Sequence, residues 1–158
     1  MEIDQEESQS SQKGVLNPLM QNVGKTLLNE VEKQYREKEE MSDDLLLALH
    51  SVFGNSFEKA LDLLDSSPSS VVFLRSPSKR CVIQVPGSSG ATYTIYPGIN
   101  YCPCPAYNFH VLGKRSRVTC KHVLVAYLSQ LMGKSRQIDV SNEELTKVLC
   151  NAAHICDT

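Results

Sequence analysis

The sequence predicts an α+β protein, in which an N-terminal helical segment is followed by a small antiparallel sheet and a helix that are joined by a Cys3His site. Three observations lead to this fold class. Apolar residues recur at helical spacing between residues 19 and 64, and short β-rich runs separated by turns begin at residue 71. Two pairs of metal-ligand residue types then flank the return to helical spacing near residue 120.

The composition is that of one compact domain with a tail. The chain has 158 residues, of which 41% are apolar and 22% are charged, which is ordinary for a globular protein. Residues 1–12 lack the apolar stretch of a signal peptide, and no run of about 18 apolar residues predicts a membrane span. Six cysteines in such a chain favour a reducing compartment, where metal binding is commoner than a disulfide framework.

Charge is distributed unevenly along the chain. Residues 1–65 carry 6 basic and 14 acidic side chains (net −8), and residues 139–158 carry 1 basic and 4 acidic ones (net −3). Residues 66–138 carry 9 basic and no acidic side chains (net +9). A block without carboxylates suits contact with an anionic partner. Packing of this block against the acidic N-terminal part of the same chain explains the pattern equally well.

Three helices are predicted in the N-terminal half. The first starts at Asn17-Pro18, where an N-cap precedes the residue best tolerated at the first helical position. The second starts at Ser42, has acidic residues in its first turn and ends near Gly54, and the third spans residues 57–64. The apolar stripe of the first helix consists of Leu19, Val23, Leu27, Val31 and Tyr35.

The second and third helices carry more apolar surface than two short helices can bury between themselves. The surplus faces either the Cys3His module or a partner protein, and packing into the core is favoured.

The pattern changes after a linker at residues 66–70. Three β-rich runs, 71–74, 81–85 and 92–96, are separated by turns rich in Ser, Pro and Gly. They predict the small antiparallel sheet.

Two helices are predicted after the sheet. One spans residues 119–132 and ends at Gly133. The last begins with a capping box formed by Ser141 and Glu144 and continues to Ala152.

The strongest functional signal is the pair Cys102 and Cys104, followed after a spacer by Cys120 and His122. Three thiolates and one imidazole make a closed tetrahedral site of the kind that holds structural zinc. Residues i and i+2 of an extended chain point to the same side, so the first pair can share one ion. Residues i and i+2 of a helix lie about 200° apart. We therefore expect Cys120 at the very start of its helix, with Thr119 as N-cap and His122 in the first turn.

Other reactive residues are weaker candidates. Cys81 is expected to be a buried strand residue. Cys150 and His154 lie four residues apart on the last helix, near Cys156. A second metal site there is the less favoured alternative, because a chain terminus is a poor cage for an ion.

Enzymatic activity is not expected. Gly24-Lys25-Thr26 resembles the end of a P-loop, but that motif needs a glycine where Leu19 stands, and the triplet lies inside a helical pattern. No acid–base pair accompanies the cysteine cluster.

Basic side chains lie between the two halves of the predicted site. The candidates for contact with nucleic-acid phosphates are Lys114, Arg115, Arg117 and Lys121. A solvated turn explains these charges equally well. Tyr107 and Phe109 suit base stacking, but packing in the core is the favoured role for both.

Cys-x-Cys, a spacer and Cys-x-His at the start of a helix together resemble the SWIM-type zinc finger, and the match covers residues 102–132. Over about residues 42–150 the chain also resembles the SWIM subunits of Shu complexes. The similar stretches are LLLALHSVFG (45–54), ALDLLD (60–65), CPCPAY (102–107) and CKHVLVAYLSQ (120–130).

This resemblance implies one structural Zn2+, with ligand roles for Cys102, Cys104, Cys120 and His122. It implies a non-enzymatic adaptor in the nucleus that pairs with a RecA-like partner and promotes recombinase assembly on single-stranded DNA during homologous recombination repair. The alternative is a single-stranded nucleic-acid binder that acts without a RecA-like partner. No membrane and no small-molecule substrate are expected.

Charge and resemblance together divide the chain into four parts. These are a disordered acidic tail (1–14), a helical partner-docking region (15–65), a basic SWIM zinc-finger module (66–138) and a C-terminal helix with its tail (139–158).

Overall fold

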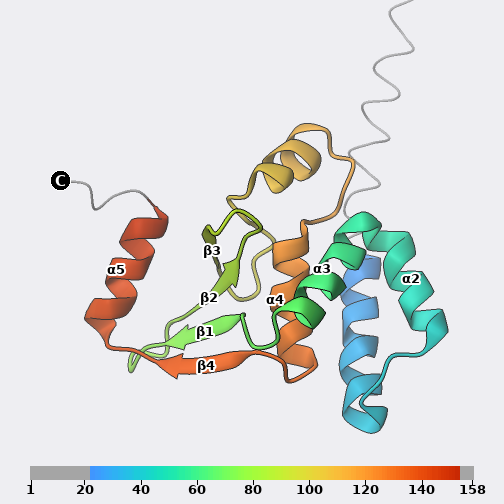
Figure 1. Cartoon of the computed structure of the whole chain (residues 1–158), viewed down its shortest axis with the longest axis horizontal. Coiled ribbons are helices and arrows are strands. Elements are labelled where there is room, and N and C mark those ends of the chain that lie inside the picture. The colour runs from blue at the N-terminus through green and yellow to red at the C-terminus, as the bar shows by residue number, and fades with distance from the viewer. Residues whose placement is uncertain (1–21, 154–158) are drawn as a thin grey trace, which may run out of the picture.

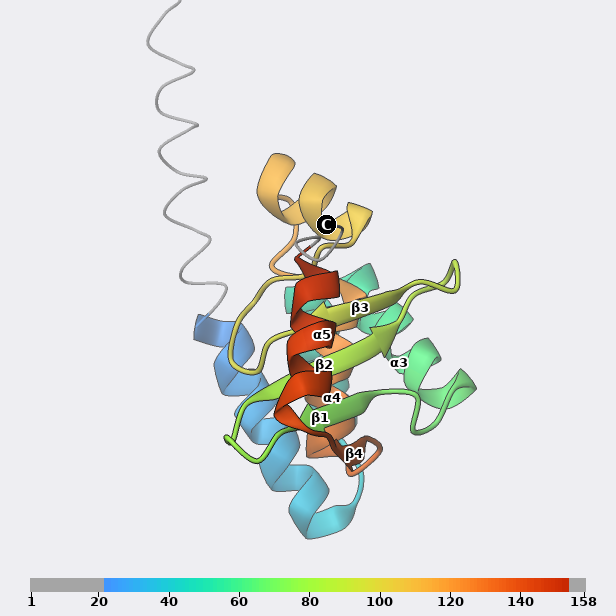
Figure 2. The same cartoon turned by 90° about the vertical axis from the view of Figure 1, so that its left-hand side faces the viewer.

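The computed structural model describes residues 22–153, and α4 is the central element of this part of the chain. On one side of α4 lie the N-terminal helix, α2 and α3, and on the other side lies the sheet (Figure 1). α5 covers the opposite face of the sheet (Figure 2). The helices are the N-terminal helix (22–38), α2 (Asp43–Phe53), α3 (Asn55–Ser66), α4 (Lys121–Leu131) and α5 (Asn142–Ala152). None of the helices in residues 22–153 combines the length and the apolar character needed to span a bilayer.

The sheet has four strands in the order β3-β2-β1-β4. Its strands are β1 (Val72–Arg75), β2 (Cys81–Pro86), β3 (Thr92–Ile95) and β4 (Arg136–Asp139). β1, β2 and β3 pair antiparallel, which confirms the three strands predicted from the sequence. β4 pairs parallel to β1, so the sheet is mixed rather than antiparallel throughout. The parallel pair is possible because the connection through β2, β3 and α4 is long enough to cross over.

The predicted helices are present over the described residues, with ends that differ by at most two residues from those predicted. The Ser42 hydroxyl caps α2 by accepting a hydrogen bond from the backbone N–H of Leu45 at 3.3 Å. Gly54 separates α2 from α3 at a positive φ of 58°, which favours glycine. Thr26 of the P-loop-like triplet lies within the N-terminal helix, and its hydroxyl donates to the Asn22 carbonyl at 3.1 Å. The predicted start at Asn17-Pro18 lies outside the described residues.

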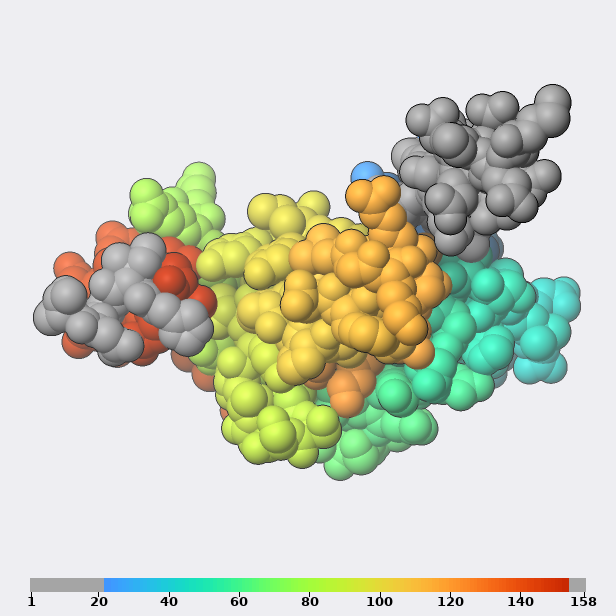
Figure 3. All heavy atoms as spheres, turned by 90° about the horizontal axis from the view of Figure 1, so that it is seen from above, coloured from blue at the N-terminus to red at the C-terminus, as the bar shows by residue number. Residues whose placement is uncertain are grey.

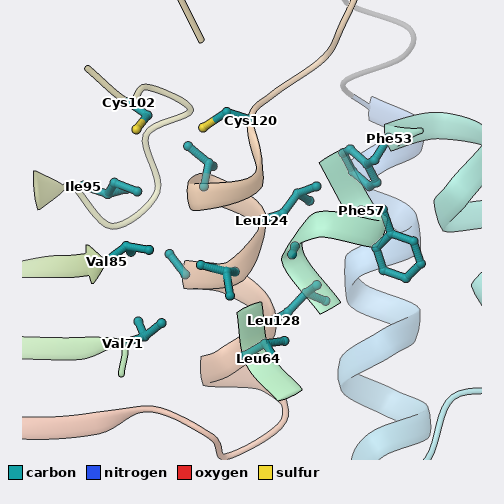
Figure 4. Close-up of a cluster of buried hydrophobic side chains, with 14 of the residues drawn as sticks. Phe53, Phe57, Leu64, Val71, Val85, Ile95, Cys102, Cys120, Leu124 and Leu128 are labelled. Atoms are coloured by element: carbon teal, nitrogen blue, oxygen red, sulfur yellow. The ribbon is translucent and has the colours of Figure 1, made fainter. Parts of the chain in front are cut away.

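One hydrophobic cluster runs from the N-terminal helix through α3 and α4 to the sheet. Figure 4 shows Leu124 and Leu128 of α4 between side chains of α3 and side chains of the sheet. Most of the apolar surface of α2 and α3 lies in this core, as favoured from the sequence, while Leu47 of α2 remains 67% exposed. The buried residues of these two helices are Leu45, Leu49, Phe53, Ser56, Phe57, Ala60 and Leu64.

A second, smaller cluster lies on the other face of the sheet. Val72, Leu74 and Val82 of the sheet pack there against Leu145 of α5. The predicted capping box is present, because the Ser141 hydroxyl and the Glu144 carboxylate each accept a backbone N–H of the other residue.

The sequence did not reveal the π-helix η1 (Tyr107–Gly113) that lies between the two halves of the cysteine cluster. Tyr107 is buried there, as expected. Phe109 is 53% exposed, so its assignment to the core was wrong. A strand would place Tyr107 and Phe109 on the same side, whereas the helical turn of η1 places them on different sides.

Candidate metal centre

The structure brings the four predicted ligand side chains together. Cys102, Cys104, Cys120 and His122 are all buried, and their ligand atoms lie within 4.8 Å of one another. Cys102 Sγ and His122 Nδ1 lie 3.8 Å apart. Zinc–sulfur bonds of about 2.3 Å in a tetrahedron place sulfur atoms about 3.8 Å apart. The donor set and its spacing therefore fit a tetrahedral zinc ion.

The first half of the cluster comes from an extended segment that ends at η1. Cys102 and Cys104 point to one side, as residues i and i+2 of an extended chain do. The backbone N–H of Tyr107 donates to Cys104 Sγ at 3.3 Å. A hydrogen bond of this kind stabilises the thiolate form, which is the form that binds metal.

The second half comes from the start of α4. Cys120 is the N-cap of α4, with an extended backbone (φ −97°, ψ 169°), and His122 lies in the first turn. The prediction of Thr119 as N-cap was wrong by one residue, because the Thr119 hydroxyl donates to Asn100 Oδ1 at 2.7 Å instead. The extended backbone at Cys120 turns its sulfur toward the side on which the imidazole lies, which a regular helix does not permit.

His122 is held mainly by packing. Its ring lies against that of Tyr93 of β3, with 4.6 Å between ring centroids. Nδ1 faces the thiols, so Nε2 is the ring nitrogen that takes no part in the Cys3His group. It is buried without a hydrogen-bond partner among the described residues. Metal-bound histidines commonly donate their second N–H to a partner, and packing on Tyr93 takes over the orienting role in this chain.

Asn100 links the two halves of the cluster, and the sequence did not single it out. Its Nδ2 donates to the Val118 carbonyl at 3.0 Å, and its Oδ1 accepts from Thr119. Its backbone carbonyl also accepts the hydroxyl of Tyr107. One side chain therefore fixes the segment before Cys102 to the segment before Cys120.

The three thiols influence one another's protonation. The hydrogen bond between Cys102 and Cys104 raises the pKa of Cys102 and lowers the pKa of Cys104. A hydrogen bond with Cys102 lowers the pKa of Cys120, but the hydrogen bond with Cys104 and burial outweigh it and raise that pKa to about 11. Thiols bind a metal as thiolates, so a divalent cation displaces thiol protons when it binds.

The other predicted site residues lie outside this cluster. Cys81 is half-buried on β2, and Cys150 is half-buried on α5. His154 and Cys156, the other members of the alternative second site, lie outside the described residues. The four basic candidates, Lys114, Arg115, Arg117 and Lys121, lie between η1 and the first turn of α4.

Comparison with known proteins identifies relatives over most of the chain. The chain is similar to zinc finger SWIM domain-containing protein 7 from Mus musculus, at 47% identity over 123 residues, which are 78% of this chain and 80% of the relative. The protein of the same name from Danio rerio is 43% identical over 80% of this chain and 89% of the relative. The protein of the same name from Homo sapiens is 44% identical over 78% of this chain and 86% of the relative. No protein-family model matches the chain, and no solved structure matches it significantly.

The Cys3His group and these relatives define a zinc-finger protein of the SWIM class. The chain belongs to the family of zinc finger SWIM domain-containing protein 7. Its buried Cys3His group can bind a metal ion, and the name of the relatives indicates zinc.

Proposed function

We propose that this chain is a non-enzymatic adaptor subunit of a Shu-type complex, held together by one structural zinc ion. In this role it acts in the nucleus, pairs with a RecA-like partner and promotes recombinase assembly on single-stranded DNA during homologous recombination repair. The observation that carries the proposal is the closed Cys3His group, buried at the end of the central helix in a chain of this family.

The donor set supports a structural role for the ion. Three thiolates and one imidazole fill the four positions of a tetrahedron and leave none for a bound water or substrate. All four side chains are buried, and their sulfur atoms belong to the same hydrophobic cluster as α3 and α4. A zinc ion at this place cross-links the end of the sheet to the start of α4, so metal binding and folding are coupled.

The arrangement of the helices supports an adaptor. The N-terminal helix, α2 and α3 pack onto α4, and the start of α4 carries two of the four ligands. The positions of these three helices, and of any partner-binding surface on them, therefore depend on the metal through α4. Loss of the ion is expected to disturb partner binding without any direct contact between metal and partner.

The proposal is tested by metal content and partner recovery in parallel. Chain purified under reducing, chelator-free conditions is expected to contain one zinc per molecule, and His122→Ala is expected to contain much less. Affinity purification with mass spectrometry is expected to recover a RecA-like protein with the wild type and not with His122→Ala. Cys81→Ser is the matched control, because this half-buried cysteine lies outside the Cys3His group.

Two outcomes contradict the proposal separately. Wild-type chain without zinc would refute the metal site. A zinc-loaded chain that recovers no RecA-like protein would refute the adaptor role and leave the alternative, a nucleic-acid binder without such a partner.

A further inference from the structure

Five basic side chains form a surface on the side of the molecule that carries η1, which we term the cationic surface. Four of them come from the segment between η1 and the first turn of α4, and the fifth comes from α3, more than fifty residues earlier. Figure 3 looks onto this side, where the yellow and orange spheres of residues 105–118 meet the green of α3. The cationic surface consists of Lys59, Lys114, Arg115, Arg117 and Lys121.

The position of Lys59 next to the other four basic side chains follows from the fold and not from the sequence. Lys59, Arg117 and Lys121 line the same small cavity of about 90 Å³. The buried Ser56 hydroxyl donates to the Thr119 carbonyl at 3.2 Å and holds α3 against the segment that leads into α4. Desolvation and then the positive charges of Arg117, Lys114 and Lys59 lower the pKa of the nearby His110, which is consistent with their common location.

These charges have no acidic partners within residues 22–153. The ion pairs formed there join Arg36 to Glu32, His50 to Glu58, and Lys134 to Asp65, and none includes a member of the cationic surface. Residues 66–138 contain no Asp or Glu that could approach them. Glu58 and Asp62 share α3 with Lys59, but no ion pair within residues 22–153 neutralises a member of the cationic surface. A surface of this kind attracts anions.

An aromatic ring lies beside the charges. Phe109 of η1 is half exposed, and Lys114 Nζ lies 4.7 Å from the centre of its ring. The His110 ring contacts Phe109 edge-on, at 4.9 Å between centroids and 87° between planes, and so supports it from the side. An exposed phenyl ring fixed next to cations is the combination on which unpaired bases stack while their phosphates are neutralised.

We propose that the cationic surface and Phe109 together bind single-stranded nucleic acid, with phosphates along Lys59, Arg117 and Lys121 and a base against Phe109. Duplex is a poorer fit, because stacked and paired bases cannot reach a protruding ring. A peptide of acidic residues alone, such as polyglutamate, uses the charges but has no aromatic group to stack on the ring. The inference rests on the proposed function only for the identity of the strand as DNA, and the contact itself belongs to this chain rather than to a partner.

The test is the binding of fluorescent oligo(dT) to the purified, zinc-loaded full chain, followed by anisotropy at several salt concentrations. Binding is expected to weaken steeply with salt, and each lost phosphate contact is expected to reduce the slope of log K against log salt by about 0.7. The double variant Lys59→Gln with Arg117→Gln is expected to bind more weakly and with a shallower slope. The matched control is Lys79→Gln with Arg80→Gln, which removes two charges of the same block from the turn between β1 and β2.

The aromatic contact has its own pair of variants. Phe109→Ala is expected to weaken binding roughly 5- to 100-fold, the effect of removing one base–aromatic stack. Leu112→Ala, which removes another exposed apolar side chain of η1, is expected to change little. Zinc content and circular dichroism of each variant show that the fold is retained.

Several results would overturn the inference. Equal losses in the two double variants would show only a general charge effect. Duplex or polyglutamate bound as tightly as oligo(dT), or full affinity in Phe109→Ala, would exclude a strand-specific surface. Because no partner is present in this assay, failure leaves the partner recovery and zinc content of the proposed function untouched.

Discussion

The two faces of the sheet are covered in different ways. On one face, α4 is buried nearly all round, and its core continues into α2, α3 and the three ligand cysteines. On the other face, α5 covers a cluster with only four buried members, and Leu145 is the only buried residue of that helix. The core on the α4 face therefore joins the N-terminal helix, α2, α3, α4 and the sheet, whereas the cluster on the α5 face joins only α5 to the sheet.

Because of this difference, substitutions on the α4 face are expected to lower the stability of the whole fold, and substitutions on the α5 face only that of α5. Changes on the α4 face act on the large core and the metal centre together, because Cys102, Cys104 and Cys120 belong to that core. Changes on the α5 face are expected to release α5 without disturbing the rest, since partial unfolding usually follows such structural units.

Removal of the metal is expected to have the largest effect. With the proposed zinc ion bound, three thiols and an imidazole in the core become metal ligands, and apparent zinc-binding energies of small zinc fingers are of order 10 kcal/mol. A chelator under reducing conditions is therefore expected to lower the unfolding temperature more than any single core substitution. Hydrogen exchange is expected to show loss of protection in α4 before α5. Unchanged protection in α4 after complete zinc removal would contradict the central role of the site.

Leu128→Ala is expected to have the next largest effect. This residue of α4 is 0% exposed and packs in the large cluster, so truncation leaves a cavity that costs about 2–5 kcal/mol. The free energy of unfolding from urea titration measures the loss. Leu112→Ala, at a position that is 54% exposed, is the control and is expected to cost less than about 0.5 kcal/mol.

Leu145→Ala tests the other face directly. This side chain is 2% exposed, but its cluster is small and borders solvent, so the cost is expected near the lower limit of about 2 kcal/mol. Faster hydrogen exchange is expected in α5 alone, with zinc content unchanged. Equal destabilisation of α4 would mean that the two faces unfold as one unit.

Asn100→Ala is expected to weaken zinc binding about 10- to 100-fold, as the loss of groups that orient metal ligands does. The reason is that Asn100 ties together the segments that carry Cys102 and Cys120. Competition with a chromophoric chelator measures the affinity. Asn151→Ala on the exposed side of α5 is the control. If Asn100→Ala bound zinc as tightly as the wild type, the hydrogen bonds of Asn100 would not be needed to position the ligands.

The capping box of α5 is expected to give the smallest effect. Ser141→Ala is expected to cost about 0.5–2 kcal/mol. Hydrogen bonds from the backbone and hydroxyl of Ser141 lower the pKa of Glu144 below its usual 4.5. The charged carboxylate therefore stabilises α5 above that pH, and the contribution is lost as the pH falls through the lowered value. Urea titrations at several pH values are expected to show this acid-side loss in wild type and not in Glu144→Gln.

Local chemistry explains what could be predicted from the sequence. The starts of α2 and α5 follow from Ser42 and Ser141, whose hydroxyl groups satisfy free N–H groups. The proximity of the four ligands follows from the i and i+2 geometry of an extended chain and from the irregular backbone at a helix start.

The features that were missed depend on contacts between distant segments. β4 has four exposed residues and no apolar alternation, and it is a strand only because β1 offers an edge. In the sequence Asn100 is an ordinary loop residue, and its role appears only in the fold, where it bonds to Val118 and Thr119. Lys59 belongs by sequence to an acidic region and joins the other cations only through the packing of α3 on the segment before α4.

Residues 105–118 form an excursion in which Tyr107 and Val111 are buried and most other side chains are exposed, and this arrangement has a practical consequence. Hydrogen bonds fix both ends of this excursion. The backbone N–H of Tyr107 donates to Cys104 Sγ at the first end, and Asn100 Nδ2 donates to the Val118 carbonyl at the second. Lengthening a loop between fixed ends costs little, about 0.6 kcal/mol for each doubling. A fluorophore or an epitope inserted after Gly113 is therefore expected to leave the Cys3His group intact, which makes this position suitable for labelling the protein.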